Sequence, residues 1–367
     1  MASGDVAATR VSALREGLAG AGLDALLVTN PNSRRYLVGL PTPVLGRFRA
    51  LIVSRTAVAS LAPDPDHGAA TAVAEEIVQR SWRLGEDPIA ALASLARDAG
   101  LARAAIGIED DHLTVAQYKR LRRLLPGSEL MPAAALVHGM RMAKSKPELA
   151  VIRRGASILA DTTTRVLESA ALGDSEIKLQ TRLVLQLKEQ GIRSIRPQVQ
   201  FSEHSARPGT PPTTRELRRG DVILIDVAAT EGGYWADICR WASVGPPAPS
   251  VMDLWTTVGA ARQAVLDATR AGVDGSTLDA AARAAIESAG HTDKIRHLTG
   301  HGIGLEVHEP PFLEPASADV LVEGAVFTIE PGLFVDDAFG VRREDNVVVV
   351  ADGAELLSAP QHEPIVL

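Results

Sequence analysis

The sequence predicts a protein of two domains, an α/β domain over residues 1–135 followed by an α+β domain over residues 136–367. Three observations lead to this prediction. The chain has 367 residues, which is long for a single hydrophobic core. Its first third alternates short apolar runs with helical patterns, as α/β domains do. The remainder combines long amphipathic helices with strand-like segments, several of which are adjacent in the chain.

Short apolar runs in the first domain are typical of buried strands. The clearest of them reads DALLVTN, and the predicted strands are 24–30, 50–54 and 104–109. Apolar residues at helical spacing predict helices over 6–22, 88–100 and 113–125. No predicted strand leads into a Gly-rich phosphate loop, so we do not expect a nucleotide-binding domain.

The second domain begins near a helix start. Pro147 with Glu148 behind it is typical of the first turn of a long helix. The helices predicted from there on are 147–170, 175–190, 251–271 and 276–289. The strand-like segments between and after them are 194–202, 221–244, 325–335 and 341–350.

Composition excludes several classes of protein. Lys and Arg number 38 and Asp and Glu 45, which gives a formal charge of −7, whereas nucleic-acid binders normally carry a basic excess. The basic run YKRLRRLL (118–125) is explained as the solvated face of a helix. A single cysteine, Cys239, cannot form an internal disulfide. Neither a secretory signal in MASGDVAATR nor a transmembrane run is present, so we expect a cytoplasmic protein that binds neither membranes nor nucleic acid.

The stretch GDVILIDVAATEGGYWADICRWASVG (220–245) predicts a β-hairpin that brings two aspartates together. If TEGG forms a four-residue loop, Ala229 pairs with Tyr234, and Asp226 then lies directly opposite Asp237. Directly opposed residues have Cβ atoms about 4.5–5.5 Å apart, and like charges there destabilise the sheet. A divalent cation is the simplest compensation for this repulsion.

A second hairpin is predicted in VFTIEPGLFVDDAFGVRREDNVVVV (326–350). Its turn centres on Asp337, which places Glu330 opposite Glu344. A bulge at Pro331–Gly332 would shift this register.

Histidines concentrate beside these carboxylates in HLTGHGIGLEVHEPP (297–311), which holds three of the chain's nine, His297, His301 and His308. One acidic pair on a strand would be interpreted as solvent-facing. Two opposed pairs within apolar strands, together with clustered imidazoles, favour a shared cation site instead. Four carboxylates and one imidazole suit two divalent ions held about 3.5–4 Å apart.

His301 is the expected nitrogen ligand, because its neighbours Gly300 and Gly302 let backbone approach the site closely. His308 is then a proton donor or oxyanion partner rather than a ligand. A lone histidine would be interpreted as a hydrogen-bonded structural side chain. GHGIG does not fit a nucleotide loop, since it is GxGxG and no helix follows it.

These motifs resemble those of the pita-bread metallopeptidases, in particular the Xaa-Pro aminopeptidase and prolidase branch. The resemblance covers nearly the whole chain and is carried by DALLVTNPN, YLVG, IGIE, RMAKSKPELAVIRRG, VILIDVAATEGGYWADICR, GHGIGLEVHEPP, FTIEPGL and VRREDNVVV. It implies a creatinase-like N-terminal domain over 1–135 and a pita-bread catalytic domain over 136–367. It also implies a homodimer and short proline-containing peptides as substrates.

The resemblance assigns the metal ligands residue by residue. Asp226 binds one ion, Asp237 and Glu344 bridge both, and His301 with Glu330 holds the other. We expect two divalent ions, with Mn²⁺ preferred on ligand hardness and Co²⁺ or Zn²⁺ as alternatives.

Further side chains are expected to act on the substrate. The resemblance places His297 and His308 in the substrate pocket and matches Arg342 to an arginine common near the last ligand. We expect Glu330 to accept a proton from the attacking water, and His308 to donate a hydrogen bond to the scissile carbonyl. His297 would orient the leaving group or the peptide, and Arg342 would steady the ligands.

Some positions depart from the family's pattern. Gly209 stands where proline-specific members usually carry a pocket histidine, and His204 lies nearby. Phe312 replaces an arginine that many dipeptidases use for the substrate carboxylate. Cys239 and Trp241 replace the threonines of the DITRT phrase, and we interpret Cys239 as a small neighbour of the metal centre rather than a nucleophile.

The expected function is hydrolysis of the Xaa-Pro bond at the N-terminus of short peptides by a dinuclear metal centre. One alternative is a creatinase-like C–N hydrolase acting on a small non-peptide amide, although that branch has lost the metal ligands. Another is a catalytically silent binding module on the same fold, whose signature would be loss of ligands.

Overall fold

A computed structural model describes residues 4–40, 46–64 and 77–367 of the chain. It divides into two compact units, Met1–Arg141 and Met142–Leu367. The division expected at residues 135 and 136 falls near the start of α5 (Ala134–Met142), the last helix of the first unit.

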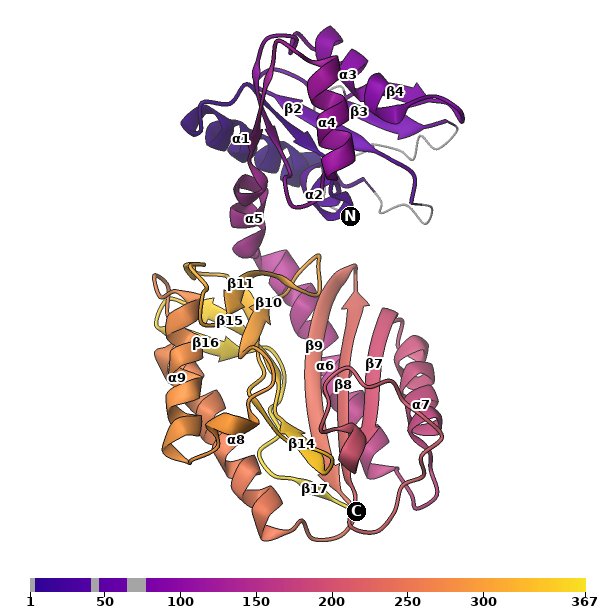
Figure 1. Ribbon diagram of the computed structural model, residues 1–367, viewed down its shortest axis with the longest axis vertical. Helices are drawn as coiled ribbons and strands as arrows, with labels where there is room; N and C mark the ends of the chain where they lie inside the picture. Colours follow the sequence, from indigo (N-terminus) through magenta and orange to yellow (C-terminus); the bar gives the residue numbers. More distant parts are fainter. Residues whose placement is uncertain (1–3, 41–45, 65–76) are drawn as a thin grey trace. The chain divides into compact units, whose positions relative to one another are not determined.

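The described part of the first unit is a six-stranded mixed sheet in the strand order β4-β3-β2-β1-β5-β6, and helices lie beside this sheet (Figure 1). Its strands are β1 (Ala25–Val28), β2 (Ala50–Ser54), β3 (Val58–Pro63), β4 (Ile77–Trp82), β5 (Ala105–Ile108) and β6 (Glu129–Pro132). Its helices besides α5 are α1 (Gly4–Gly20), α2 (Pro31–Val38), α3 (Pro88–Asp98) and α4 (Val115–Leu124). All three predicted strands and all three predicted helices are confirmed, as β1, β2, β5, α1, α3 and α4.

The short helix α2 escaped prediction because its start resembles a turn. Pro31 occupies its first turn, and the Asn30 side chain accepts hydrogen bonds from the backbone amides of Asn32 and Ser33. Gly39, with φ of 70°, ends the helix in the left-handed conformation. At eight residues, α2 is too short to reveal a helical period in the sequence.

The second unit is built from two larger sheets and one two-stranded ribbon, β13–β14. The sheet orders are β17-β9-β8-β7 and β11-β10-β12-β15-β16. The helices are α6 (Lys146–Glu168), α7 (Glu176–Glu189), α8 (Pro249–Ala268) and α9 (Gly275–Ser288), as predicted to within a few residues. The strands are β7 (Arg193–Phe201), β8 (Val222–Glu231), β9 (Tyr234–Ser243), β10 (Gly300–Gly302), β11 (Glu309–Leu313), β12 (Val326–Ile329), β13 (Gly332–Val335), β14 (Phe339–Arg342), β15 (Asp345–Val350), β16 (Gly353–Leu356) and β17 (Ile365–Val366).

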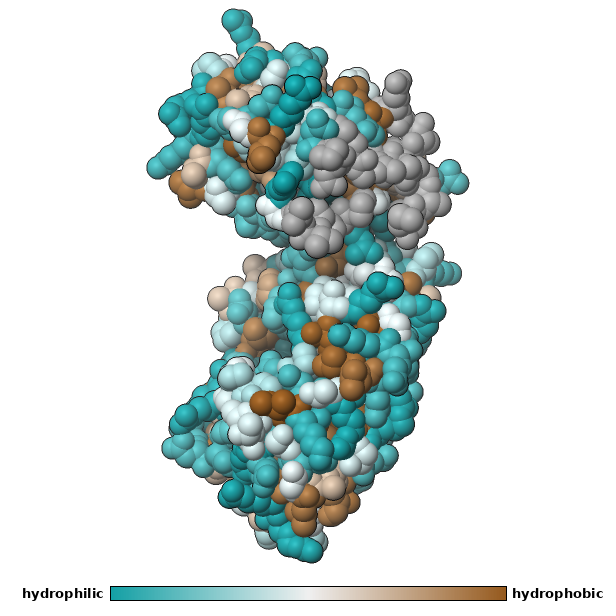
Figure 2. Space-filling view, turned by 90° about the vertical axis from the view of Figure 1, so that its right-hand side faces the viewer, coloured by the Kyte–Doolittle hydropathy of each residue, from teal (hydrophilic) through white to brown (hydrophobic). Residues whose placement is uncertain are grey.

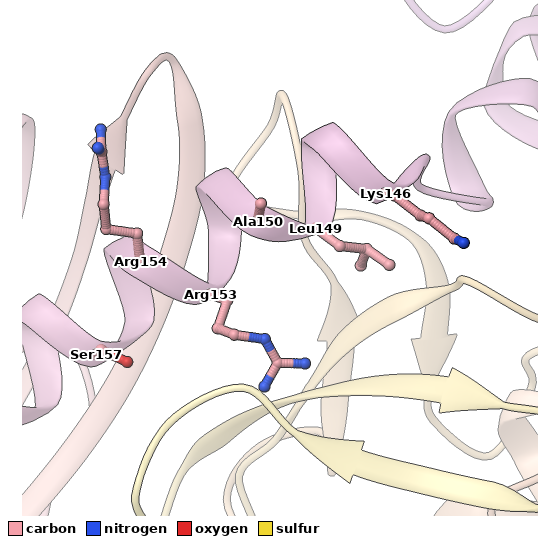
Figure 3. A pocket seen from close by; sticks show the side chains of 6 residues that line it. All are labelled: Lys146, Leu149, Ala150, Arg153, Arg154 and Ser157. Atoms are coloured by element: carbon pink, nitrogen blue, oxygen red, sulfur yellow. The ribbon is translucent and has the colours of Figure 1, made fainter.

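Helix α6 is fixed at its start and on two sides. Pro147 lies in its first turn, as predicted, and the Glu148 carboxylate accepts a hydrogen bond of 2.8 Å from the Ser145 backbone amide. Arg153 and Arg154 point to opposite sides of the helix (Figure 3). Arg153 pairs with Glu355 of β16 at 2.8 Å, and Arg154 pairs with Glu231 of β8. Both arginines that line the pocket of about 540 Å³ beside them therefore already have carboxylate partners.

Strand β8 is buried on both faces, which positions the acidic residues. Ile223, Ile225 and Val227 pack into the core beneath α6 and α7, whereas Val222 and Leu224 pack into the core beneath α8 and α9. Residues that alternate along a strand share a face. Asp226 therefore lies on the second face, in line with Val222 and Leu224.

The register predicted for the first hairpin is wrong by two residues. Glu231 pairs with Tyr234, and the loop between them is only Gly232-Gly233, with φ of 53° and 85°. Two successive glycines permit the positive φ angles of a two-residue turn, so the strands extend further than a TEGG loop allows. Asp226 consequently pairs with Cys239, and Asp237 pairs with Ala228. The two aspartates are diagonal neighbours on one face rather than directly opposed.

The register predicted for the second hairpin is confirmed. Ile329 pairs with Asp345, and Gly332 pairs with Arg342, so the same register holds on both sides of Glu330 and Glu344. Glu330 and Pro331 interrupt the ladder without shifting it, so no bulge at Pro331–Gly332 changes the register. Asp337 lies in the turn with φ of 57°.

No helix in the described part of the chain is long and apolar enough to cross a membrane. The face of the second unit that carries α7 is turned toward the viewer in Figure 2, where small groups of hydrophobic residues lie among hydrophilic ones. Exposed apolar side chains of α7 and the turn before it are Leu172, Ile177 and Leu185. Scattered apolar residues of this kind are normal for a protein surface.

Candidate metal centre

Five chain segments of the second unit each contribute one side chain to an acidic cluster. Asp226 lies on β8, Asp237 on β9 and His301 on β10. Glu330 follows the last residue of β12, and Glu344 precedes β15. All five side chains are at least nine-tenths buried.

The ligand atoms of the cluster lie close together. One oxygen of Asp237, one oxygen of Glu344 and one ring nitrogen of His301 are all within 4.8 Å of one another. His301 Nε2 lies 3.2 Å from Glu330 Oε1. Asp226 joins through Arg342, whose guanidinium is hydrogen-bonded to the Asp226 carboxylate and lies 3.9 Å from Glu330 Oε2. The structure thus brings together all five predicted ligands.

His301 is oriented by its backbone surroundings. Its Nδ1 lies 3.0 Å from the Gly302 carbonyl oxygen, so Nδ1 carries the hydrogen and donates it. Nε2 faces Glu330 Oε1 at 3.2 Å, where it donates when the ring is protonated; once unprotonated, it would present its lone pair to a cation, as metal-bound histidines do. The flanking glycines are required, because a Cβ at Gly300 would collide with the carbonyl of Thr328, and one at Gly302 with those of Glu309 and Pro310.

Burial and mutual repulsion dominate the electrostatics of the carboxylates. Burial raises the pKa of Asp237 well above its usual range, and the charge of Asp226 raises it further. The pKa of Glu344 is raised well above its usual range by burial and by Asp237. Burial also acts to raise the pKa of Glu330, but the hydrogen bond from His301 and nearby positive charges lower it to about 2.

The cluster fits divalent cations on two observations. Asp237 Oδ1 and Glu344 Oε2 are buried and have no hydrogen-bond partner among the described residues. Among the described residues, the four buried carboxylates share the positive charge of Arg342, and burying unpaired charge is costly. Oxygen donors with one imidazole are the ligands that hard divalent ions prefer.

Two further histidines and an arginine border the ligands. Arg342 Nε donates to His297 Nε2 at 3.3 Å, and His297 Nδ1 donates to the Leu298 carbonyl at 2.6 Å. Burial and the charge of Arg342 lower the pKa of His297 to about 4, which keeps its ring neutral. His308 is exposed at the edge of the cluster, with its ring centroid 4.2 Å from that of His301.

Sequence reasoning missed residues that hold the ligands in place. Asn346 Oδ1 accepts a hydrogen bond of 3.2 Å from the Asp237 amide, and its Nδ2 donates to the Asp237 carbonyl. The Thr328 hydroxyl accepts from the His301 amide at 3.0 Å and lies 3.3 Å from Glu330 Oε1. Thr328 precedes Glu330 by two positions, and Asn346 follows Glu344 by two. This proximity in the sequence was the feature from which they could have been predicted.

A buried ion-pair network supports the strand that carries Glu344. Arg240 donates to the carbonyl oxygens of Cys239 and Glu344 at 3.0 and 2.8 Å. Asp345 lies between Arg240 and Arg262, at 3.1 and 2.7 Å. The network thereby links β9 to the segment of Glu344.

The residues that differ from the family's usual substrate-pocket pattern have distinct surroundings. His204 is held by Glu176 at 2.9 Å. Gly209 donates its amide to Gln198, the cross-strand partner of Asp226. Phe312 pairs with His301 across β10 and β11, so the two share a face.

The two residues that stand in place of the family's threonines, Cys239 and Trp241, are both buried but in different surroundings. Burial raises the pKa of Cys239 well above its usual range, so its thiol stays protonated and unreactive. Trp241 is fully buried in the core beneath α8, and its ring centroid lies 5.6 Å from that of Trp255.

Comparisons with known proteins agree with this architecture. Residues 150–351 match metallopeptidase family M24, and residues 10–143 match the Creatinase/Prolidase N-terminal domain. Among curated relatives, the chain is 31% identical to probable dipeptidase PepE of Mycobacterium tuberculosis over 99% of this chain and 97% of that protein. It is 29% identical to an Xaa-Pro dipeptidase of Lactobacillus delbrueckii subsp. lactis, covering 90% of this chain and 92% of that protein.

Solved structures of peptidases are also similar to this chain over nearly its whole length. The Xaa-Pro dipeptidase from Bacillus anthracis superposes with a TM-score of 0.88 at 29% identity, covering 98% of this chain and all of that one. The X-Pro aminopeptidase from Thermotoga maritima gives 0.86 at 27% identity, covering 97% of this chain and 99% of that one. The pita-bread fold is therefore confirmed for the second unit, and the chain belongs to metallopeptidase family M24, as a metal-dependent hydrolase with a creatinase-type N-terminal domain.

Proposed function

We propose that this metallopeptidase hydrolyses the bond between the first residue and proline in short peptides. The observation that carries the proposal is the convergence of four carboxylates and His301 in one buried cluster. Relatives named Xaa-Pro dipeptidase and X-Pro aminopeptidase support the choice of substrate. These relatives and the five retained ligands do not favour the creatinase-like alternative.

Asp226, Asp237, His301, Glu330 and Glu344 would hold two divalent ions, with Mn²⁺ preferred and Co²⁺ or Zn²⁺ as alternatives. When bound, such ions lower the pKa of coordinated water toward about 7 and so supply a nucleophile at neutral pH.

The chain's own side chains have separate tasks. Glu330 lies within the ligand set, 3.2 Å from His301 Nε2, and its carboxylate accepts the proton that the attacking water loses. His308 is accessible beside His301 and donates a hydrogen bond to the scissile carbonyl as negative charge develops on its oxygen. The neutral ring of His297 orients the peptide, and Arg342 holds Asp226 in place beside the ligand set.

We also propose that the protein is a homodimer located in the cytoplasm. The single cysteine supports a reducing compartment, and the resemblance of the N-terminal domain supports the dimer. Gel filtration with light scattering tests the dimer, and a monomeric mass would contradict it.

A substrate panel tests the proposed reaction. The metal-stripped chain is reloaded with Mn²⁺, Co²⁺ or Zn²⁺ and supplied with Xaa-Pro dipeptides, Xaa-Pro tripeptides, matched Xaa-Ala peptides and small non-peptide amides. Cleavage of the Xaa-Pro peptides alone is the expected result. Exclusive turnover of the small amides would overturn the assignment in favour of the creatinase-like reaction.

His308→Ala tests the role of that side chain. Loss of a hydrogen-bond donor to a developing oxyanion lowers kcat by about 10²–10³-fold. The matched control is His362→Ala, which alters an exposed histidine of the C-terminal segment and should leave kcat unchanged. Equal kcat in both variants would remove His308 from the mechanism.

A further inference from the structure

The sheet face that carries Asp226 and Asp237 also carries an arginine. Strands β7, β8 and β9 are neighbours in this sheet (Figure 1). Arg196 of β7 pairs with Ala228 of β8, and Ala228 pairs with Asp237 of β9. Residues directly opposite each other in antiparallel strands point to the same face. Arg196 therefore lies on the face of the metal ligands, with its Cα two strand spacings, or about 10 Å, from that of Asp237.

Trp235 orients the guanidinium group of Arg196. The Arg196 Cζ lies 4.7 Å from the centroid of the Trp235 ring, and a cation over an aromatic face is attracted to it. Trp235 precedes Asp237 by two positions in β9, so both side chains point to the same face. The Trp235 amide donates a hydrogen bond of 2.7 Å to the Gly304 carbonyl, which joins β9 to the segment that leads to His308.

The charge of Arg196 acts on His308. Burial and the charge of His301 lower the pKa of His308, and the charge of Arg196 lowers it further. Charges affect one another strongly only over short distances in water, so the guanidinium lies near the His308 ring. His308 in turn borders the ligand set, with its ring against that of His301. Arg196 is therefore placed beside the position at which a substrate would meet His308.

The side chain of Arg196 is exposed, and it has no ion pair or hydrogen bond with another of the described residues. Other arginines near this sheet are paired, Arg342 with Asp226 and Arg154 with Glu231. A guanidinium that is held by an aromatic ring and not by a carboxylate keeps its N–H donors for a ligand.

We propose that Arg196, oriented by Trp235, binds a carboxylate of the substrate beside the scissile bond. This inference rests on the proposed peptide hydrolysis, in which His308 contacts the reacting carbonyl. A planar guanidinium binds carboxylate oxygens in a bidentate manner. Two groups of a short peptide offer a carboxylate close to the scissile bond, the C-terminus of an Xaa-Pro dipeptide and an acidic side chain of the first residue. Arg196 would make substrates with such a group the preferred ones.

Steady-state kinetics of the Mn²⁺-loaded full-length protein test the proposal with two matched pairs of substrates. Ala-Pro and Ala-Pro-NH₂ differ in the C-terminal carboxylate, whereas Asp-Pro-NH₂ and Asn-Pro-NH₂ differ in the acidic side chain. In at least one pair, the substrate with the carboxylate should have a kcat/KM about tenfold higher, mainly through a lower KM. This is the low end for a charge-assisted hydrogen bond, because Arg196 is exposed. The pair that shows the difference identifies the source of the carboxylate.

Arg196→Gln should reduce this ratio to within about twofold of one, and Arg196→Lys, which keeps the charge without the planar fork, should retain part of it. Both members of a pair are measured on one preparation, so differences in folding or metal content between variants cancel in the ratio. The matched control is Arg219→Gln, which removes an exposed arginine from the turn before β8 with the same loss of charge. It should keep the ratio of the parent protein.

Two results would overturn the proposal while peptide hydrolysis itself stands. One is a parent protein that shows no preference in either pair, and the other is an Arg196→Gln variant that keeps the parent's ratio. Failure of the parent protein to cleave any of the four peptides would instead overturn the proposed function, and the role of Arg196 with it.

Discussion

A buried ion pair lies directly behind the loop that carries His308. Lys144 Nζ is 3.0 Å from Glu309 Oε1, and the two side chains are 2% and 4% exposed. The other oxygen of Glu309 accepts a hydrogen bond of 3.2 Å from the Glu306 amide. Because Glu309 follows His308 in the chain and begins β11, the pair fixes the position of that loop.

Lys144→Met replaces the ammonium group by an apolar chain of similar length and so removes the cation that pairs with the buried Glu309 carboxylate. Breaking one half of a buried pair costs about 3–5 kcal/mol. For a domain of about 150–250 residues, each kcal/mol shifts Tm by about 2–4 °C, so we expect Tm to fall by about 6–20 °C. Glu309→Gln alone leaves the ammonium unpaired and should cost a similar amount.

The double variant Lys144→Met/Glu309→Gln removes both charges, and the oxygen of the introduced side-chain amide can still accept from the Glu306 amide. Its stability should lie within about 1–2 kcal/mol of the parent, which gives a coupling energy of about 3 kcal/mol or more. Scanning calorimetry measures all four proteins at one fixed Mn²⁺ concentration, because metal binding itself raises Tm. Additive losses in the double variant would refute the reasoning, as would a Lys144→Met protein that melts with the parent.

Three further predictions concern the second unit. Asp237→Asn should lower the bound metal measured by elemental analysis and reduce turnover to the metal-free level, whereas a normal metal content would contradict the ligand assignment. Thr328→Val removes the hydroxyl that bonds the His301 amide, so metal affinity in a competition titration should fall about 10–100-fold, with Thr328→Ser close to the parent. Burial acts to raise the pKa of Asp221, but the hydrogen bonds from Arg215 outweigh it and lower this pKa. The contribution of Asp221 to stability is therefore present above the unfolded pKa of about 3.9 and is lost as pH falls through the folded value. Asp221→Asn should therefore lower Tm at pH 7, with the difference from the parent shrinking in melts below about pH 4; a difference that persists in acid would count against this.

The sequence was sufficient to predict the long helices and the paired strands, because their hydrophobic periods are strong. The face on which Asp226 and Asp237 lie could also be predicted, since a shift of two residues keeps every side chain on its side of the sheet. The pairing partner could not, because it depended on whether TEGG formed a four-residue loop or Gly232-Gly233 a two-residue turn. The second hairpin has its turn at Asp337, and its register followed from the sequence directly.

The partners of the buried charges were beyond sequence reasoning. Lys144 and Glu309 are 165 residues apart, and Arg240 and Asp345 are 105 apart. No local period links such positions, and only the packing of separate segments brings them together. The roles of charged residues outside the ligand set therefore required the structure.

The glycines of GHGIG show how one local motif depends on three distant contacts. Gly300 leaves space for the carbonyl of Thr328, and Gly302 for the carbonyl of Glu309. A Cβ at Gly304 would meet the Glu309 carboxylate and the Lys144 side chain. The first two glycines admit neighbouring strands to the site of His301, and the third admits the ion pair behind His308. The spacing of the three glycines is therefore set by the close packing of other segments around His301 and beside His308. This explains why the spacing fits neither a phosphate loop nor a helix start.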